Sequence, residues 1–280
     1  MKSILVPVED HDRTENILST ALFFARIFGS RMTGFALAPA TTPFLAADVV
    51  GASIIYEPLV EHNEERSAQA RALFHAFMGR EKVRTAGEGV EGPSWSWKDN
   101  VPPGDHMVGY LGRVYDITVV GRPGQQMSGP RALTLDAALF DSGRPVLIAP
   151  PERPQSIGRR VVIAWNQSPE TAHAVALALR VLAQADDVVV LTVEGSGVPG
   201  PSGEDLAAYL GINGIKARTM NVAPGSRSAG ETILDEARAL GCDLLIKGAY
   251  TQSRLRQIIF GGATRHILEK AEVPVFMAYS

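Results

Sequence analysis

The chain has 280 residues, of which 45% are hydrophobic and 20% charged, and its formal net charge is −3. This composition excludes long disorder, and the length suffices for one large domain or for two of about 140 residues. The small negative charge excludes the basic surface typical of nucleic-acid binding and the polybasic patch typical of membrane binding. A single cysteine, Cys242, excludes an internal disulfide framework and suits a reducing cytosol.

The first element in chain order is an apolar run in MKSILVPVED, which Glu9 and Asp10 end at strand length. No small-residue cleavage site follows, and no segment approaches about eighteen uninterrupted apolar residues. We therefore expect a cytoplasmic protein without a membrane span. The acidic cluster at residues 9–12 sits where the strand turns into a helix, so we interpret Asp12 or Thr14 as the helix N-cap rather than as part of a metal site.

Helical spacing of apolar residues follows at 17–28, and a strand-like run follows at 33–37. A stretch rich in proline and glycine, residues 39–58, precedes the next helical pattern at 59–78. This stretch is either an excursion that faces a partner or an insertion without function, and the sequence favours neither.

The second half of the chain repeats the pattern of the first. The matching segments are SILVPVED (3–10) with RVVIAWNQS (160–168), DITVVGRPG (116–124) with DLLIKGAYT (243–251), and GRPVLIAP (143–150) with AEVPVFMAY (271–279). Between the halves lies a polar, proline-rich segment that is typical of a linker, residues 150–158. The repeat predicts two domains, residues 1–150 and residues 157–280.

Both halves alternate short, continuously apolar runs with longer helical patterns, as in the run DVVVLTV at 187–193. Strands that are apolar on both faces belong to parallel sheets covered by helices on both sides. The sequence thus predicts an α/β fold with two doubly wound, Rossmann-like parallel-sheet domains in tandem. The apolar runs at 144–149 and 273–278 predict that the two domains pair edge to edge within the chain.

Common catalytic and phosphate-binding motifs are missing from the sequence. It contains no P-loop, H-E-x-x-H, C-x-x-C or G-x-S-x-G pattern. The segment GEGVEG at 87–92 satisfies G-x-G-x-x-G, but it precedes the strand-like PSWSW rather than a helix, so we discard it. No pair of carboxylates stands out as an acid–base couple, and we predict neither catalytic residues nor a metal site.

The loop at 248–268 is the strongest candidate for a ligand site. It follows an apolar run at 243–247, and its Gly-Gly pair opens a helical pattern, so backbone N–H groups at a helix N-terminus are available to an anion. Alternatively, the glycines only permit a tight turn and the arginines lie in solvent. The candidate ligands of a phosphate are Gly248, Gly261, Gly262 and Ala263 through the backbone, Thr264 through its hydroxyl, and Arg254 or Arg256 through charge.

These residues resemble the universal stress protein family, and the resemblance covers essentially the whole chain as a tandem pair. ATP-binding members of that family carry a glycine, two residues, a second glycine, nine residues, and then a glycine followed by serine or threonine. In this chain Gly248 and Gly261 keep their places, whereas Thr251 replaces the second glycine and Gly262 replaces the serine or threonine. The resemblance implies an adenine nucleotide, ATP with Mg²⁺, as the ligand of the second domain.

The resemblance also implies residues beside the base or ribose, namely Trp165 and Asn166, with Asn166 at the place of a family aspartate. The first half departs further from the family. Glu9 takes the aspartate position there, and Thr134-Leu135 stand where the glycine pair is expected. We therefore expect a degenerate first domain and a single site in the second.

The leading hypothesis is a stress-response protein that binds ATP as a regulatory ligand and is at most a weak ATPase. The alternative is a pseudo-dimeric scaffold for partner proteins that binds no nucleotide. Neither hypothesis involves nucleic acid or a membrane, and both allow the whole chain to form a homodimer.

Overall fold

The computed structural model describes residues 1–39, 56–124, 129–249 and 262–279. Most of the stretch 39–58 therefore lies outside the described residues, as do Thr251, Arg254 and Gly261 of the candidate site. Among the described residues, no helix has the length and apolar character that crossing a membrane requires.

The first half of the chain alternates strands and helices. Its elements are β1 (Ser3–Val8), α1 (Thr14–Phe28), β2 (Arg31–Ala36), α2 (Tyr56–Arg80), β3 (Arg84–Thr85), β4 (Ser94–Lys98), α3 (His106–Gly112), β5 (Ile117–Gly121), α4 (Ala132–Asp141) and β6 (Val146–Ala149).

The second half follows the same alternation. Its elements are β7 (Arg160–Ala164), α5 (Pro169–Leu182), β8 (Asp187–Val193), α6 (Gly203–Ile212), β9 (Arg218–Val222), α7 (Ala229–Ala239), β10 (Leu244–Gly248), α8 (Gly262–Lys270) and β11 (Val275–Ala278).

The described strands form one 11-stranded sheet with the order β3-β4-β2-β1-β5-β6-β11-β10-β7-β8-β9. Every pairing within a half is parallel. In each half the chain starts near the centre, runs outward, and then returns to the other side of its first strand. This topology confirms the doubly wound α/β prediction, and it creates a switch in strand order between β1 and β5 and between β7 and β10.

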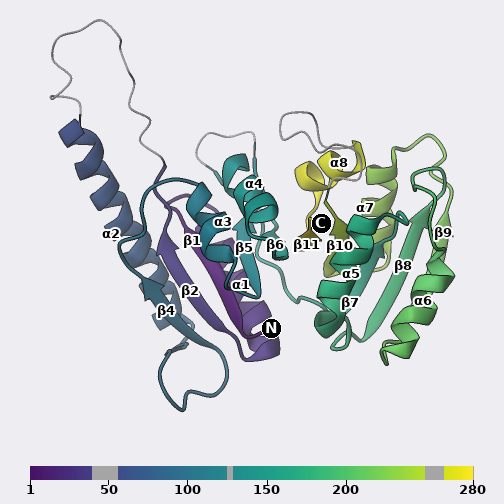
Figure 1. Cartoon of the computed structure of the whole chain (residues 1–280), viewed down its shortest axis with the longest axis horizontal. Helices are drawn as coiled ribbons and strands as arrows, with labels where there is room; N and C mark the ends of the chain where they lie inside the picture. The colour runs from purple at the N-terminus through teal and green to yellow at the C-terminus, as the bar shows by residue number, and fades with distance from the viewer. Residues whose placement is uncertain (40–55, 125–128, 250–261, 280) are drawn as a thin grey trace, which may run out of the picture.

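The two halves join through their last strands, which pair antiparallel with Val275 opposite Ile148 and Met277 opposite Val146. Figure 1 shows the halves side by side with β6 and β11 at the junction. The rings of Phe140 and Tyr279 also meet there edge to face, with centroids 4.9 Å apart. The predicted edge-to-edge pairing within the chain is therefore confirmed.

Helices cover both faces of the sheet and divide the core into two layers. One layer packs α1, α2, α5 and α6 against the sheet, and the other packs α3, α4, α7 and α8 against the opposite face. Because helices bury both faces, the strands read as continuous apolar runs instead of alternating ones. The layers meet solvent at the ends of the strands, where the loops lie.

Local signals set where several helices begin. Ser168 caps α5 by accepting a hydrogen bond from the Thr171 backbone N–H, and Pro169 follows at the first helical position. The predicted cap of α1 is wrong. Arg13 stands at the N-cap without a side-chain hydrogen bond, and the Thr14 hydroxyl donates to the carbonyl of Glu9 instead.

Candidate functional site

Each half has a pocket at the carboxyl ends of its strands, the place where ligands bind in doubly wound sheets. The second-half pocket has a volume of about 260 Å³ and lies beside the switch point between β7 and β10. The first-half pocket is larger, about 440 Å³, and lies at the ends of β1 and β2. Sequence reasoning expected a site only in the second half and did not predict the larger cavity.

The second-half pocket has apolar walls and one polar end. The described residues that line it are Ala164, Trp165 and Asn166 after β7, Leu191, Val193, Ser196 and Val198 at the end of β8, Ala229 and Ile233 of α7, Lys247 of β10, and Gly262, Ala263 and Thr264 of α8. Five predicted site residues therefore line one pocket. Gly248 is not among the lining residues, and Thr251, Arg254 and Gly261 lie outside the described residues.

Trp165 and Asn166 are held by contacts within the protein. The Trp165 indole N–H donates to the Pro201 carbonyl over 3.0 Å, and the side chain belongs to the core layer of α5 and α6. The Asn166 amide oxygen accepts from the Thr171 hydroxyl. Asn166 thus lines the pocket. The Trp165 ring also lines it, but it packs in the core layer on the opposite face of the sheet.

Gly248 has a packing reason to be glycine. A Cβ at this position would overlap the backbone of Glu170 and Thr171 in the first turn of α5. At the corresponding glycine of the first half, Gly121, a Cβ would collide with the side chains of Pro130 and of Ile17 in α1. Both glycines therefore let a helix approach the end of a strand, whether or not a ligand binds.

The first turn of α8 forms the polar end of the second-half pocket. A Cβ added at Gly262 would meet no described atom within 4 Å. The first N–H groups of a helix have no partner within the helix, and the helix dipole makes them attractive to an anion. Ala263 and Thr264 continue this turn, and Thr264 is 4% exposed.

Lys247 completes the polar end, and sequence reasoning missed it. Its side chain is 5% exposed, and its ammonium donates to the Thr264 hydroxyl over 2.9 Å and to the Gly248 carbonyl over 3.1 Å. Burial lowers the pKa of Lys247 to about 8, and the carboxylate of Glu170 acts in the opposite direction. The available signal was a lysine within an otherwise apolar strand run, since a lysine is almost never fully buried without a specific partner.

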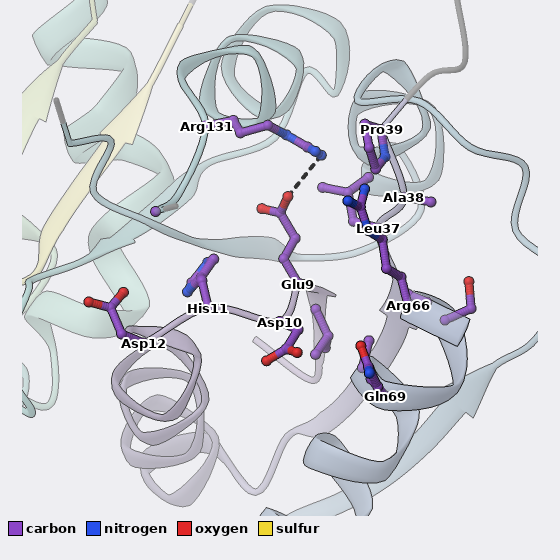
Figure 2. Close-up of a pocket in the computed structure, with 15 residues that line it drawn as sticks. Glu9, Asp10, His11, Asp12, Leu37, Ala38, Pro39, Arg66, Gln69 and Arg131 are labelled. Carbon is purple, nitrogen blue, oxygen red and sulfur yellow. Dashed lines mark ion pairs between the residues drawn. The ribbon is translucent and has the colours of Figure 1, made fainter. Parts of the chain in front are cut away.

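The first-half pocket is built around an internal ion cluster (Figure 2). Arg131, at the start of α4, points toward Glu9 at the end of β1, and its Nη2 lies 2.9 Å from Glu9 Oε1. The same nitrogen lies 3.0 Å from Asp105 Oδ1, and Thr134 of α4 donates its hydroxyl to that oxygen over 2.7 Å. The protein's own carboxylates therefore occupy the start of α4.

Burial raises the pKa of Glu9 to about 7, although Arg131 lowers it and Asp105 raises it further. The surroundings of this half-buried carboxyl group therefore favour its protonated, neutral form. Asp10 and Asp12 point away from Arg131 in Figure 2 and leave Glu9 as the carboxylate nearest to the guanidinium among the labelled residues.

The two helix starts thus differ in charge. Thr134 and Thr264 are each the third residue of their helices, α4 and α8. Thr134 donates to a carboxylate, whereas Thr264 accepts from an ammonium. The start of α4 already has an internal anion, and the described part of the second-half pocket has a cation with no carboxylate in an ion pair with it.

The pockets offer no constellation for metal catalysis within the described residues. No group of three or more histidine, cysteine, aspartate or glutamate side chains is placed there to hold a metal ion. Cys242 is buried, and burial raises the pKa of its thiol to about 12, so it is not a reactive thiolate.

Comparison with known protein families finds one match, in the second half of the chain. Residues 217–278, which include β10, α8 and β11, match the model of the universal stress protein family. No match is found among curated protein sequences.

Solved structures match the chain over its whole length. A universal stress protein from Archaeoglobus fulgidus DSM 4304 superposes with a TM-score of 0.73 at 14% identity, covering 99% of this chain and 98% of that chain. A putative universal stress protein from Pseudomonas aeruginosa UCBPP-PA14 has a TM-score of 0.53 at 14% identity, covering 100% and 93%. At these identities the structures establish a shared fold. The second half of the chain therefore matches the model of the universal stress protein family, and the chain shares the tandem fold of these structures over its full length.

Proposed function

We propose that the second-half pocket binds an adenine nucleotide, ATP, as a regulatory ligand. The observation that carries the proposal is the N-terminus of α8 at the end of an apolar pocket. It lies next to a buried cation, and the described residues that line the pocket contain no carboxylate. Apolar walls suit a base, and convergent polar groups at one end suit phosphates. The family whose model matches residues 217–278 includes ATP-binding members.

In this proposal Asn166 borders the base or ribose, and Gly262, Ala263 and Thr264 bind phosphate. The predicted contributions of Thr251, Arg254 and Gly261 remain part of the proposal. Any Mg²⁺ would come with the nucleotide, because no described carboxylate cluster is placed to hold it. We do not propose hydrolysis as the main activity, since the described pocket lining contains no carboxylate or histidine to orient a water.

Binding would stabilise the folded chain by mass action, so the nucleotide level would set the population of the folded or assembled form. The competing function, a scaffold for partner proteins, needs no ligand in this pocket. The junction of β6 with β11 supports it as a second candidate, because this pairing already builds a dimer-like body from one chain.

The test measures the melting temperature with and without excess ATP and Mg²⁺ in the wild type and in Gly262→Asp. The variant places a carboxylate at the start of α8, imitating the first half, at a position where an added Cβ would meet no described atom within 4 Å. We expect a rise on the order of several degrees in the wild type and none in Gly262→Asp. Gly262→Asn controls for the size of the side chain and should keep at least part of the shift. The absence of a shift in the wild type would favour the scaffold.

A further inference from the structure

The helix α6 lies at the outer end of the second half, beside the last strand of the sheet, β9 (Figure 1). It buries Gly203, Leu206 and Leu210 against the core. No charged residue occurs from Leu206 to Ile215, so beyond the first turn its solvent side is uncharged. Ile212 is 87% exposed, the highest value for a large hydrophobic residue in the part of the chain that the structure describes. Because a surface helix normally carries charged residues on its solvent side, this side of α6 is suited to an interface.

The first half shows that the fold does not require an apolar surface at this place. The helix α2 follows β2 as α6 follows β8. Its exposed residues include Glu64, Arg66 and Arg71. Two helices at equivalent places in the topology therefore present different surfaces to solvent, one charged and one apolar.

A groove with a volume of about 420 Å³ lies between α5 and α6. The described residues that line it are largely apolar: Trp165, Ala172, Val175, Pro201, Asp205, Leu206 and Tyr209. The carboxylate of Asp205 is engaged within α6, because it accepts hydrogen bonds from the backbone N–H and the hydroxyl of Ser202 over 2.9 and 3.0 Å. The groove is therefore suited to an apolar side chain.

Ile212 and the groove lie on the same side of α6. Asp205, Tyr209 and Ile212 follow the i, i+4, i+7 spacing that places residues along one side of a helix. Ile212 thus projects one turn beyond the Tyr209 end of the groove. A projecting apolar residue and an apolar groove on one helix are self-complementary about a two-fold axis, because each copy can fill the groove of the other.

We propose that α6 is a contact surface between two copies of this chain, in which the two α6 helices lie antiparallel and Ile212 of each copy enters the α5–α6 groove of the other. Leu206 and Ile212 are each three residues from Tyr209. A two-fold axis near Tyr209 therefore places Ile212 opposite Leu206 of the partner subunit. Ala208 and Gly211 are small and exposed, so the two helix backbones can approach closely.

The charges at the two ends of α6 favour the same arrangement. Its first turn carries the exposed carboxylates Glu204 and Asp205, and the exposed Lys216 follows its end. An antiparallel pair places the acidic end of each helix beside the basic end of the other, and it also sets the two helix dipoles antiparallel. The register that fills the groove is therefore also the register that pairs opposite charges.

The size of this contact sets the expected affinity. A helix of 10 residues is about 15 Å long, so the interface lies at the small end of the range for specific protein contacts. We expect a reversible dimer with a dissociation constant of about 10 to 100 µM. The inference goes beyond the proposed function and requires no nucleotide.

Sedimentation equilibrium of the full chain without nucleotide, from about 5 to 500 µM, measures this association. Ile212→Arg should weaken dimerisation about tenfold or more, because it places a charge in the apolar groove of the other copy. Val114 is 79% exposed in the first half, so Val114→Arg is the matched control and should dimerise as the wild type does. Both substitutions are at exposed positions, where the folded chain tolerates them.

A disulfide gives a second measurement, of the register itself. Tyr209 lies near the proposed axis, so Tyr209→Cys should form an intermolecular disulfide under mild oxidation, whereas Val114→Cys should not. The natural Cys242 is buried and does not compete.

Three outcomes would overturn the proposal. A wild type that stays monomeric up to about 500 µM would leave the groove to a different occupant. A dimer that Ile212→Arg and Val114→Arg affect equally would place α6 outside the contact. A dimer that is sensitive to Ile212→Arg but forms no disulfide in Tyr209→Cys would exclude the antiparallel arrangement about Tyr209.

Discussion

The Lys247 ammonium donates to the Thr264 hydroxyl over 2.9 Å and so joins β10 to the first turn of α8. The matching threonine of the first half, Thr134, donates to Asp105 over 2.7 Å. The same residue type at the same helical position therefore meets a cation in one half and an anion in the other. The two halves therefore differ in charge at equivalent helix starts.

Gly262→Ser should strengthen nucleotide binding. The substitution restores the hydroxyl found at this place in ATP-binding relatives, and an added side chain at Gly262 meets no described atom within 4 Å. One additional hydrogen bond to a charged phosphate contributes about 1.5 to 3 kcal/mol, or roughly ten- to a hundredfold in affinity. Calorimetric titration with ATP measures it, and Gly262→Ala is the control without a hydroxyl. Equal affinities of the serine and alanine variants would contradict a phosphate at this position.

Lys247 should make the unliganded protein more stable as the pH rises from about 8 to 10.5. The pKa of Lys247 is about 8 in the folded chain, compared with 10.5 for a lysine exposed to water. Between these two pH values, the unfolded chain therefore binds a proton that the folded chain has lost. The difference corresponds to about 3 kcal/mol. Glu170 is the charged group that acts on the amine among the described residues, and the other described residues that line the pocket are uncharged.

Urea unfolding at pH 7.5 and pH 10 measures this effect as the difference between the wild type and Lys247→Met. The variant should be the more stable protein at pH 7.5, and the gap should narrow at pH 10. A gap that does not change with pH would mean that Lys247 does not titrate in this range.

Glu9 should make the protein less stable as the pH rises from 4.5 to about 7. Its pKa is raised from 4.5 to about 7, so between these values the folded chain holds a proton that the unfolded chain has lost. Stability relative to Glu9→Gln should therefore fall as the pH rises from 4.5 to 7, by about 3 kcal/mol at most. Melting curves of both proteins at intervals of pH test this, and the exposed Glu88→Gln should follow the wild type.

Gly248→Ala should destabilise the second half by about 1 to 3 kcal/mol or more, because its Cβ would overlap the α5 backbone, which cannot rotate away. Gly262→Ala is the matched substitution where an added Cβ meets no described atom within 4 Å, and it should be neutral or stabilise α8 by up to about 1 kcal/mol. Chemical denaturation measures both. Equal stabilities of the two variants would show that α5 does not pack against Gly248 as closely as described.

Much of the architecture could be predicted from the amino-acid pattern. Strands buried on both faces must be apolar at nearly every position, as in DVVVLTV at 187–193. This requirement can be recognised in a short stretch of sequence. The repeated order of runs then implied two similar units. The cap of α1 was predicted wrongly because several polar residues near Asp12 compete for one role, and neighbouring contacts decide among them.

The site was only partly predictable. The helix start at Gly262 could be expected from glycines and spacing, but the role of a glycine depends on what lies opposite it. Gly248 faces the backbone of α5, whereas no described atom lies within 4 Å of a Cβ added at Gly262. Nothing in the local sequence distinguishes these two surroundings, since the contacting residues belong to other elements.

The sequence by itself determined the class of fold, the tandem repeat and the order of elements, because these follow from the periodicity of apolar residues along the chain. Only the tertiary structure decided the charge of each pocket. Arg131 reaches Glu9 across the first half, and Lys247 meets Thr264 after a separation of 17 residues. Whether a charge is neutralised depends on its distance from other charges in space and on its burial, and folding alone sets both.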